Sequence, residues 1–193
     1  MKKNLIIFIL FLFFTNSLTA DDDVKVIKEG NLNAKIKLIV YESLTCSHCA
    51  NFHRDIYPKL KEDFIDKGYA NIEFRNFPLD LASLNASKLA HCRNDGESDI
   101  LHFLYKNQKK WLSGQTLEDL NKNLEQIVKE KNFGINYNDC INNKVIEDHI
   151  LTDRINAVKK YEIEATPTLI INDKKFDNPQ NYKKLKKKLE KMI

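Results

Sequence analysis

The sequence predicts an α/β fold in which a β-α-β unit and a C-terminal β-β-α unit are separated by a block of helices. Two observations lead to this prediction. Segments with strand-like alternation occur near positions 36–42 and 71–77 and again after position 165, and the first two flank a helical pattern. Residues 80 to about 160 instead carry apolar residues at helical spacing, with no convincing strand.

The β-α-β unit begins with the segment AKIKLIVYE, which reads as an interior strand with Ile36, Leu38, Val40 and Glu42 on one face. A helix is expected next, because four apolar residues recur at helical spacing before a capping Gly68: Phe52, Ile56, Leu60 and Phe64. The segment NIEFRNF then alternates as a second strand and ends at Pro78.

The helical block contains four expected segments. The first two carry the apolar sets Ala82, Ala86, Leu89, Ala90 and Ile100, Phe103, Leu104, Trp111. The third starts at Thr116 as N-cap, with Asp119 three residues later, and ends near Gly134. The fourth covers about 138–161, with these residues expected to point inward: Ile141, Val145, Leu151, Ile155 and Val158.

The C-terminal unit starts with TPTLIIN, turns at Asn172-Asp173 and continues into KKF as a short hairpin. A last helix is expected from Asn178 as N-cap and Pro179 in the first turn.

The N-terminus has the pattern of a signal peptide for export. Lys2 and Lys3 precede the apolar run 5–14 and the small, polar stretch TNSLTA. This run is shorter than the roughly 20 apolar residues that span a bilayer, so we expect cleavage after Ala20, with an uncleaved anchor as the minority alternative. Loss of both lysines lowers the formal net charge from +4 to +2, which indicates no nucleic-acid partner.

The stretch TCSHCANFH contains Cys46 and Cys49 with two residues between them. Covalent haem attachment requires histidine directly after the second cysteine, where Ala50 stands. A zinc site would need a second close pair of ligands, which the sequence lacks, so we expect no metal and no other cofactor. All four cysteines follow the signal segment, and their even number in an exported chain favours disulfide chemistry.

Three motifs, SLTCSHCANFH, FRNFPLD and EATPTLIIN, occur in that order around the helical block. With them the chain resembles the DsbA family of bacterial exported thiol-disulfide oxidoreductases. The resemblance implies a thioredoxin-like fold with an inserted all-helical domain. Residues 1–20 would be the signal peptide, 21–78 and 161–193 the two parts of the thioredoxin-like domain, and 79–160 the helical insertion.

The resemblance makes Cys46 the nucleophile, Cys49 the resolving cysteine and Pro167 the cis-proline that faces them. Physical chemistry supports these roles, because a cysteine at a helix start meets free N–H groups that favour the thiolate. His48 can stabilise the reduced state and thereby make the disulfide a stronger oxidant. Thr166 and Pro167 would present backbone groups to an extended substrate peptide.

The sequence departs from the family pattern six residues before Cys46, where Val40 replaces a buried acid. Glu42 lies on the same face of the strand, one layer closer to the motif. It could take part in a proton relay to Cys49, or be a partly exposed surface carboxylate. Ser47 also replaces the proline that is common in the family's oxidases.

Cys92 and Cys140 lie in different segments of the helical block. We expect a structural disulfide between them, because an exported protein seldom keeps two free thiols. The alternative is that they are two separate buried cysteines that pack as small hydrophobic residues.

The resulting functional hypothesis is a periplasmic, monomeric thiol oxidase that passes the Cys46–Cys49 disulfide to reduced exported proteins. The resemblance implies reoxidation by a DsbB-like quinone-linked membrane partner. A disulfide reductase or isomerase of the same fold is the alternative, although the chain after the signal offers no room for an N-terminal dimerisation domain. The non-enzymatic alternative is a metal-binding or substrate-binding module with a structural cysteine pair.

Overall fold

The structure, a computed structural model, describes residues 23–193, so the expected signal peptide at 1–20 lies outside the described residues. The elements in chain order are β1 (Ile27–Gly30), β2 (Ile36–Glu42), α1 (Ser47–Asn51), η1 (Phe52–Ile56), α2 (Tyr57–Leu60), η2 (Lys61–Ile65), β3 (Ala70–Asn76), α3 (Leu81–His91), α4 (Asp99–Lys106), α5 (Gln108–Trp111), α6 (Leu117–Lys131), α7 (Tyr137–Ile141), α8 (Lys144–Tyr161), β4 (Thr168–Ile171), β5 (Lys174–Phe176) and α9 (Tyr182–Glu190). No helix within 23–193 combines the length and the apolar character needed to cross a bilayer.

One five-stranded sheet, in the order β1-β3-β2-β4-β5, forms the centre of the α/β part. Strands β2 and β3 are parallel, and the other pairs are antiparallel. β2 is therefore the central strand, as the sequence predicts. The edge strand β1 was not predicted, because its segment IKEG is short and buries a single side chain, Ile27.

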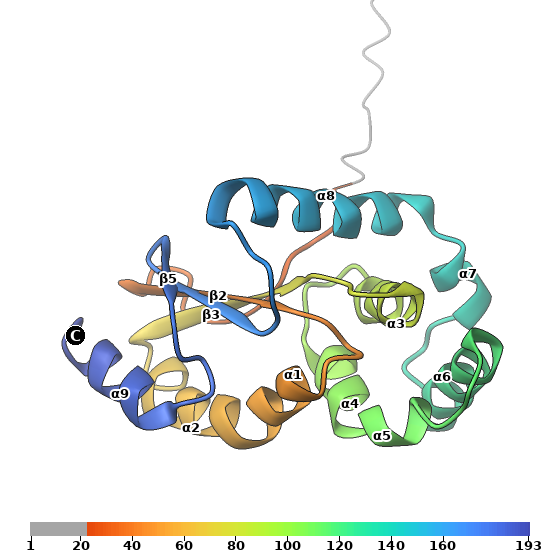
Figure 1. Cartoon of the computed structure of the whole chain (residues 1–193), viewed down its shortest axis with the longest axis horizontal. Coiled ribbons are helices and arrows are strands. Elements are labelled where there is room, and N and C mark those ends of the chain that lie inside the picture. Colours follow the sequence, from red (N-terminus) through yellow and green to blue (C-terminus); the bar gives the residue numbers. More distant parts are fainter. Residues whose placement is uncertain (1–22) are drawn as a thin grey trace, which may run out of the picture.

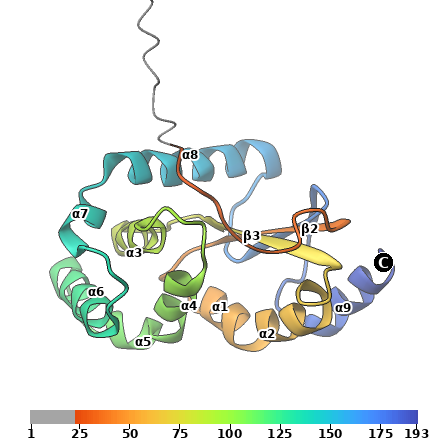
Figure 2. The same ribbon diagram turned by 180° about the vertical axis from the view of Figure 1, so that it is seen from behind.

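Helices cover both faces of the sheet (Figures 1 and 2). One face carries α9 and the continuous helix from Ser47 to Ile65, which contains α1, η1, α2 and η2, whereas α8 crosses the other face. The η segments are wider π-helical turns. η1 ends at Ile56, two residues before Pro58, whose ring and missing N–H disturb regular α-helical bonding.

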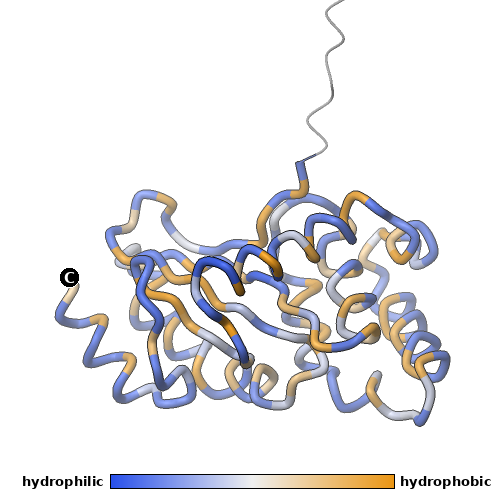
Figure 3. Tube along the Cα trace, turned by 45° about the horizontal axis from the view of Figure 1, so that its top comes forward, coloured by the Kyte–Doolittle hydropathy of each residue, from blue (hydrophilic) through white to orange (hydrophobic). Residues whose placement is uncertain are grey.

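The helices from α3 to α7 lie at one end of the sheet (Figure 1). Their buried side chains join those of the sheet in one hydrophobic cluster, which contains Leu38 and Ile72 from the strands as well as Leu104 and Trp111 from the helices. Figure 3 shows the corresponding pattern, with hydrophobic positions recurring along the helices among hydrophilic ones. The helical block and the sheet therefore share a core.

The inward face that the sequence predicts for the fourth helical segment is wrong except at Ile141, which is partly buried and packs against the main core. Val145, Leu151, Ile155 and Val158 are exposed by 37–50%, and the buried positions of α8 are Ile146, Ile150 and Ala157. Asn143 caps α8 separately from α7, so the segment is not one continuous helix.

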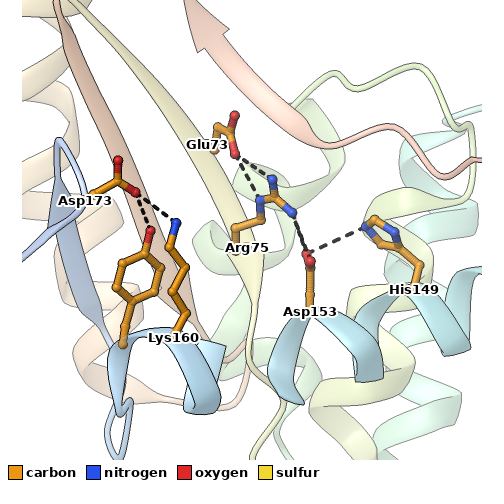
Figure 4. A network of polar contacts seen from close by, with 7 residues as sticks. Glu73, Arg75, His149, Asp153, Lys160 and Asp173 are labelled. Carbon is orange, nitrogen blue, oxygen red and sulfur yellow. Dashed lines mark hydrogen bonds and ion pairs between the residues drawn. The ribbon is translucent and has the colours of Figure 1, made fainter. Parts of the chain in front are cut away.

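A polar contact explains why apolar periodicity selected the wrong face of α8. Asp153 faces the sheet and accepts from Arg75 of β3 at 2.9 Å, while Arg75 also pairs with Glu73 at 2.7 Å (Figure 4). His149 lies 3.7 Å from the same aspartate. A search for apolar residues at helical spacing does not detect a carboxylate that faces inward.

Other local signals have mixed outcomes. Thr116 and Asp119 form the expected capping box of α6. The Asn172-Asp173 turn joins β4 and β5 with both residues at positive φ, as a turn of this type requires. The predicted cap at Asn178 is wrong, because the N-cap of α9 is Asn181, three residues later, whose side chain accepts from the Lys184 backbone N–H.

A disulfide links Cys92, at the C-terminal end of α3, to Cys140 in α7. Their Cα atoms are 5.3 Å apart, and 48 residues separate them in sequence. The link closes a loop that contains α4, α5 and α6.

We predict that the double variant Cys92→Ala/Cys140→Ala unfolds more easily than the wild type, by about 2–4 kcal/mol, because the unfolded chain regains the freedom of the open loop. Urea unfolding of both proteins, each with an oxidised Cys46–Cys49 pair, measures this difference. An unchanged unfolding free energy, together with two alkylatable thiols at these positions in native wild-type protein, would contradict the prediction.

Candidate active site

The two free cysteines lie where the central strand gives way to a helix. β2 ends at Glu42, and a short loop then leads to Cys46, whose backbone N–H donates to the Ser43 carbonyl at 3.0 Å. Cys46 is the N-cap of α1 and is partly exposed, whereas Cys49 lies one turn later and is fully buried. The pair is thus asymmetric in its access to solvent.

Contacts from distant segments hold this loop. The Gln108 side chain of α5 donates to the backbone carbonyls of Leu44 and Cys46 at 2.8 and 3.0 Å. The Thr45 hydroxyl donates to Asp80 at 2.7 Å, and Asp80 also caps α3. The loop that presents Cys46 is therefore tied to the helical block on two sides.

The environment of Cys46 favours its thiolate. Hydrogen bonding from the Cys49 thiol is the largest cause that lowers the pKa of Cys46, and it outweighs partial burial. The backbone N–H groups of Cys49 and His48 act in the same direction, so that the pKa of Cys46 falls to about 5.

The environment of Cys49 favours its thiol. Burial is the largest cause that raises the pKa of Cys49, and the hydrogen bond with Cys46, the nearby Glu42 carboxyl group and the charge of the Cys46 thiolate raise it further. At neutral pH the reduced pair therefore has a thiolate at the surface and a thiol beneath it.

A cis peptide bond joins Thr166 to Pro167 opposite the cysteines. The Cys46 Sγ atom lies 3.3 Å from the Thr166 carbonyl oxygen, to which the thiol form can donate. His48 is exposed, and its backbone carbonyl accepts from the Gln180 side chain at 2.9 Å. The sequence-predicted residues Cys46, Cys49, His48, Thr166 and Pro167 thus gather around one surface.

Glu42 is 1% exposed, which excludes the alternative of a surface carboxylate. Its Oε2 atom lies 2.7 Å from His53 Nε2, and Oε1 has no hydrogen-bond partner among the described residues. Burial is the dominant cause that raises the pKa of Glu42 well above its ordinary value. Burial also lowers the pKa of His53 to about 3, so this pair is neutral: an acid beside an uncharged imidazole.

Sequence reasoning missed His102, which connects His53 to Glu29. His102 Nδ1 lies 3.0 Å from His53 Nδ1, and His102 Nε2 lies 2.8 Å from Glu29 Oε1. Burial would raise the pKa of Glu29, but hydrogen bonds from His102, Ser98 and Tyr57 lower it to about 2. No sequence signal places His102 or Gln108 at the site, because His102 reaches it through the packing of α4 against α1 and η1, and Gln108 through its hydrogen bonds to the loop before α1.

Within 23–193, no cluster of three or more histidine, cysteine, aspartate or glutamate side chains is arranged to hold a metal ion.

Comparisons with known proteins agree with this geometry. A family model described as Thioredoxin matches residues 23–191. The chain is 28% identical over 173 residues to disulfide bond formation protein D of Bacillus subtilis, with 85% of this chain and 75% of the relative covered. It is 29% identical over 154 residues to a Rickettsia bellii protein that is provisionally named a protein-disulfide oxidoreductase. The match covers 77% of this chain but 58% of the rickettsial protein, so the chain spans little more than half of that relative's length.

Two solved structures have the same architecture. The crystal structure of Wolbachia pipientis alpha-DsbA1 is 33% identical, with a TM-score of 0.77 over 86% of this chain and 90% of that one. Oxidised BdbD from Bacillus subtilis is 24% identical, with a TM-score of 0.72 over 86% and 92%, and this second likeness shows the fold alone. The fold is therefore thioredoxin-like with a helical insertion, as the sequence predicts.

The lowered pKa of Cys46 predicts how the reduced protein responds to pH. The ultraviolet absorbance of its thiolate should titrate with a midpoint near pH 5, and this step should disappear in Cys46→Ala. Because the pKa is lower folded than unfolded (about 8.5), thiolate formation stabilises the folded reduced protein. This contribution is complete above the unfolded pKa and is lost as pH falls through about 5. A midpoint near the ordinary thiol value would contradict this account.

Proposed function

The chain belongs to the thioredoxin family and, within it, to the DsbA-like protein-disulfide oxidoreductases, and on this basis we propose that it is an exported thiol oxidase. Its reaction would be the transfer of the Cys46–Cys49 disulfide to newly exported proteins. The observation that carries this proposal is the asymmetry of the pair, with an accessible Cys46 of lowered pKa above a buried Cys49 of raised pKa.

The proposed reaction has two exchange steps. A substrate thiolate attacks Cys46 Sγ, the bond between the two enzyme sulfurs breaks, and the electron pair and one proton are taken up at Cys49. A second substrate thiolate then attacks the substrate sulfur of this mixed disulfide. Cys46 leaves as a stabilised thiolate, the substrate gains a disulfide, and the enzyme is reduced by two electrons.

The direction of transfer is inferred from the stability of the reduced form. A stabilised Cys46 thiolate favours the reduced enzyme and therefore makes its disulfide a stronger oxidant. A reductase or isomerase would keep the pair reduced in use, and the equilibrium reduction potential against glutathione separates these alternatives. Metal analysis and thiol titration of the purified protein separate both enzymes from a structural cysteine pair.

Substrate binding is proposed at the Thr166-Pro167 loop, whose backbone faces Cys46. We further propose that residues 1–20 direct export to the periplasm and that the enzyme acts there as a monomer. A DsbB-like quinone-linked membrane protein would reoxidise it. Residues 79–160 would be an insertion between the two parts of the thioredoxin-like domain, 21–78 and 161–193.

Replacement of each active-site cysteine should have a different effect. Cys46→Ser should abolish oxidation of a reduced model protein, because it removes the attacked sulfur. Cys49→Ser should instead accumulate mixed disulfides, because the Cys49 thiol can no longer attack Cys46 Sγ and release the bound substrate. Non-reducing gels and mass spectrometry follow both outcomes, and turnover by Cys46→Ser would show that the roles are assigned incorrectly.

His48→Ala should make the Cys46–Cys49 disulfide less oxidising, because the variant loses a side chain that can stabilise the thiolate at the start of α1. Equilibration with glutathione buffers measures the change in reduction potential. His149→Ala, whose side chain lies on the opposite face of the sheet, is the control and should keep the wild-type potential. Equal reduction potentials in the wild type, His48→Ala and His149→Ala would show that His48 does not make the disulfide more oxidising.

A further inference from the structure

A line of hydrogen bonds leads from the buried end of β2, through the long helix and α4, to the edge strand β1. Glu42 contacts His53 at 2.7 Å, His53 contacts His102 at 3.0 Å, and His102 contacts Glu29 at 2.8 Å. These four side chains come from β2, η1, α4 and β1, so the tertiary fold brings them together.

One arrangement of protons satisfies every contact in the line. Neutral Glu42 donates to His53 Nε2, and neutral His53 donates from Nδ1 to His102 Nδ1. His102 then donates from Nε2 to the Glu29 carboxylate. The raised pKa of Glu42 and the lowered pKa values of His53 and Glu29 agree with these charge states. Each link therefore holds one proton that points away from Glu42.

The far end of the line reaches solvent. His53, His102 and Glu29 line a cavity of about 1540 Å³ between the long helix and α4. The side chain of His53 is 5% exposed, whereas that of His102 is 27% exposed. Solvent access thus increases from the buried Glu42 to His102, and the Glu29 side chain beyond it is 16% exposed.

Building on the proposed function, we propose that His53, His102 and Glu29 conduct a proton between Glu42 and water in this cavity whenever Cys49 changes between thiol and disulfide.

The chemistry of Cys49 creates the need for such a path. During reoxidation the Cys49 thiol must lose a proton before its sulfur can attack the mixed disulfide at Cys46. Cys49 is fully buried, so it has no direct contact with bulk water. In the proposed route Glu42 first passes its own proton to His53 Nε2, and the His53 Nδ1 proton moves to His102 Nδ1. The Glu42 carboxylate formed in this way then accepts the proton of the Cys49 thiol.

The proton that reaches His102 forms an imidazolium beside Glu29, and it leaves from this pair to cavity water. The fixed negative charge of Glu29 stabilises the imidazolium. Reduction of the enzyme runs the same path inward, because the Cys49 sulfur then takes up one proton. Glu29 also accepts from Ser98 and Tyr57 at 2.6 and 2.5 Å, and Lys61 lies 3.4 Å away, so its position is held from several elements.

A purely structural role is the alternative, because the same contacts attach α4 to the long helix and to β1. Tyr105 supports this arrangement by stacking on His53, with ring centroids 3.9 Å apart. If these contacts are purely structural, breaking them lowers the stability of the fold. If they relay protons, breaking them lowers the rate of the proton-coupled steps.

Ring closure of the active-site pair isolates the proton-coupled step. Reduced protein is mixed with an excess of a chromogenic aromatic disulfide, and the released aromatic thiolate is followed by stopped flow. The first phase reports attack by the Cys46 thiolate and depends on reagent concentration. The second phase is intramolecular, because Cys49 attacks Cys46 Sγ and releases a second aromatic thiolate.

We expect His102→Phe to leave the first phase unchanged and to slow the second by at least about tenfold, as loss of positioned proton transfer would. Glu29→Gln should slow the second phase in the same direction. Imidazole in solution should accelerate ring closure in His102→Ala, because the space left by the His102 ring adjoins the cavity. If the role of His102 is purely structural, added imidazole should not change this rate. The matched control is His149→Phe, a histidine of α8 outside the line, which should behave as the wild type in both phases.

Thermal unfolding of each variant accompanies the kinetics. Wild-type ring-closure rates in folded His102→Phe and Glu29→Gln, or no response of His102→Ala to imidazole, would overturn the relay and leave the proposed function intact. Absence of the first phase in wild-type protein would overturn the proposed function, and the relay with it.

Discussion

The placement of Cys46 at the start of α1 and of Cys49 one turn deeper, inside the core, is the constraint on which the chemistry of this protein depends. It lowers the pKa of Cys46 and raises the pKa of Cys49. Cys46 stands at the helix start, where N–H groups are free, and Cys49 lies inside the core. The central strand, the following helix and the Thr166-Pro167 loop all serve to keep this asymmetry.

The helical block contributes directly to the site. Gln108 of α5 binds two carbonyls of the loop that carries Cys46, and His102 of α4 extends the hydrogen bonds of the buried acid toward solvent. The Cys92–Cys140 link closes the loop that contains both helices. A link that stabilises the helical block therefore also helps to position Gln108 and His102 near the cysteine pair.

On each face of the sheet, apolar packing is combined with a polar contact. The long helix and α9 pack through apolar side chains such as Phe52 and Leu185, which join the main core, and the long helix adds the Glu42–His53 contact to β2. α8 adds the polar Arg75–Asp153 contact to its apolar residues, next to Glu73 and His149 (Figure 4). Such a partly buried ion pair contributes little net stability, because desolvation offsets the attraction, but loss of one partner would leave the other charge uncompensated.

The sequence by itself determined the order of strands and helices around the motif and the position of Cys46 at a helix start, because each follows from local periodicity and spacing. It also indicated that Glu42 shares a face with Val40, since strand alternation is local. Tertiary structure decided that Glu42 is fully buried, that His53 and His102 meet, and that Asp153 rather than the apolar residues of α8 faces β3. His102 lies 49 residues from His53 and 73 from Glu29, and Asp153 lies 78 from Arg75. Contacts over such separations depend on how whole elements pack, and local patterns in the chain do not encode them.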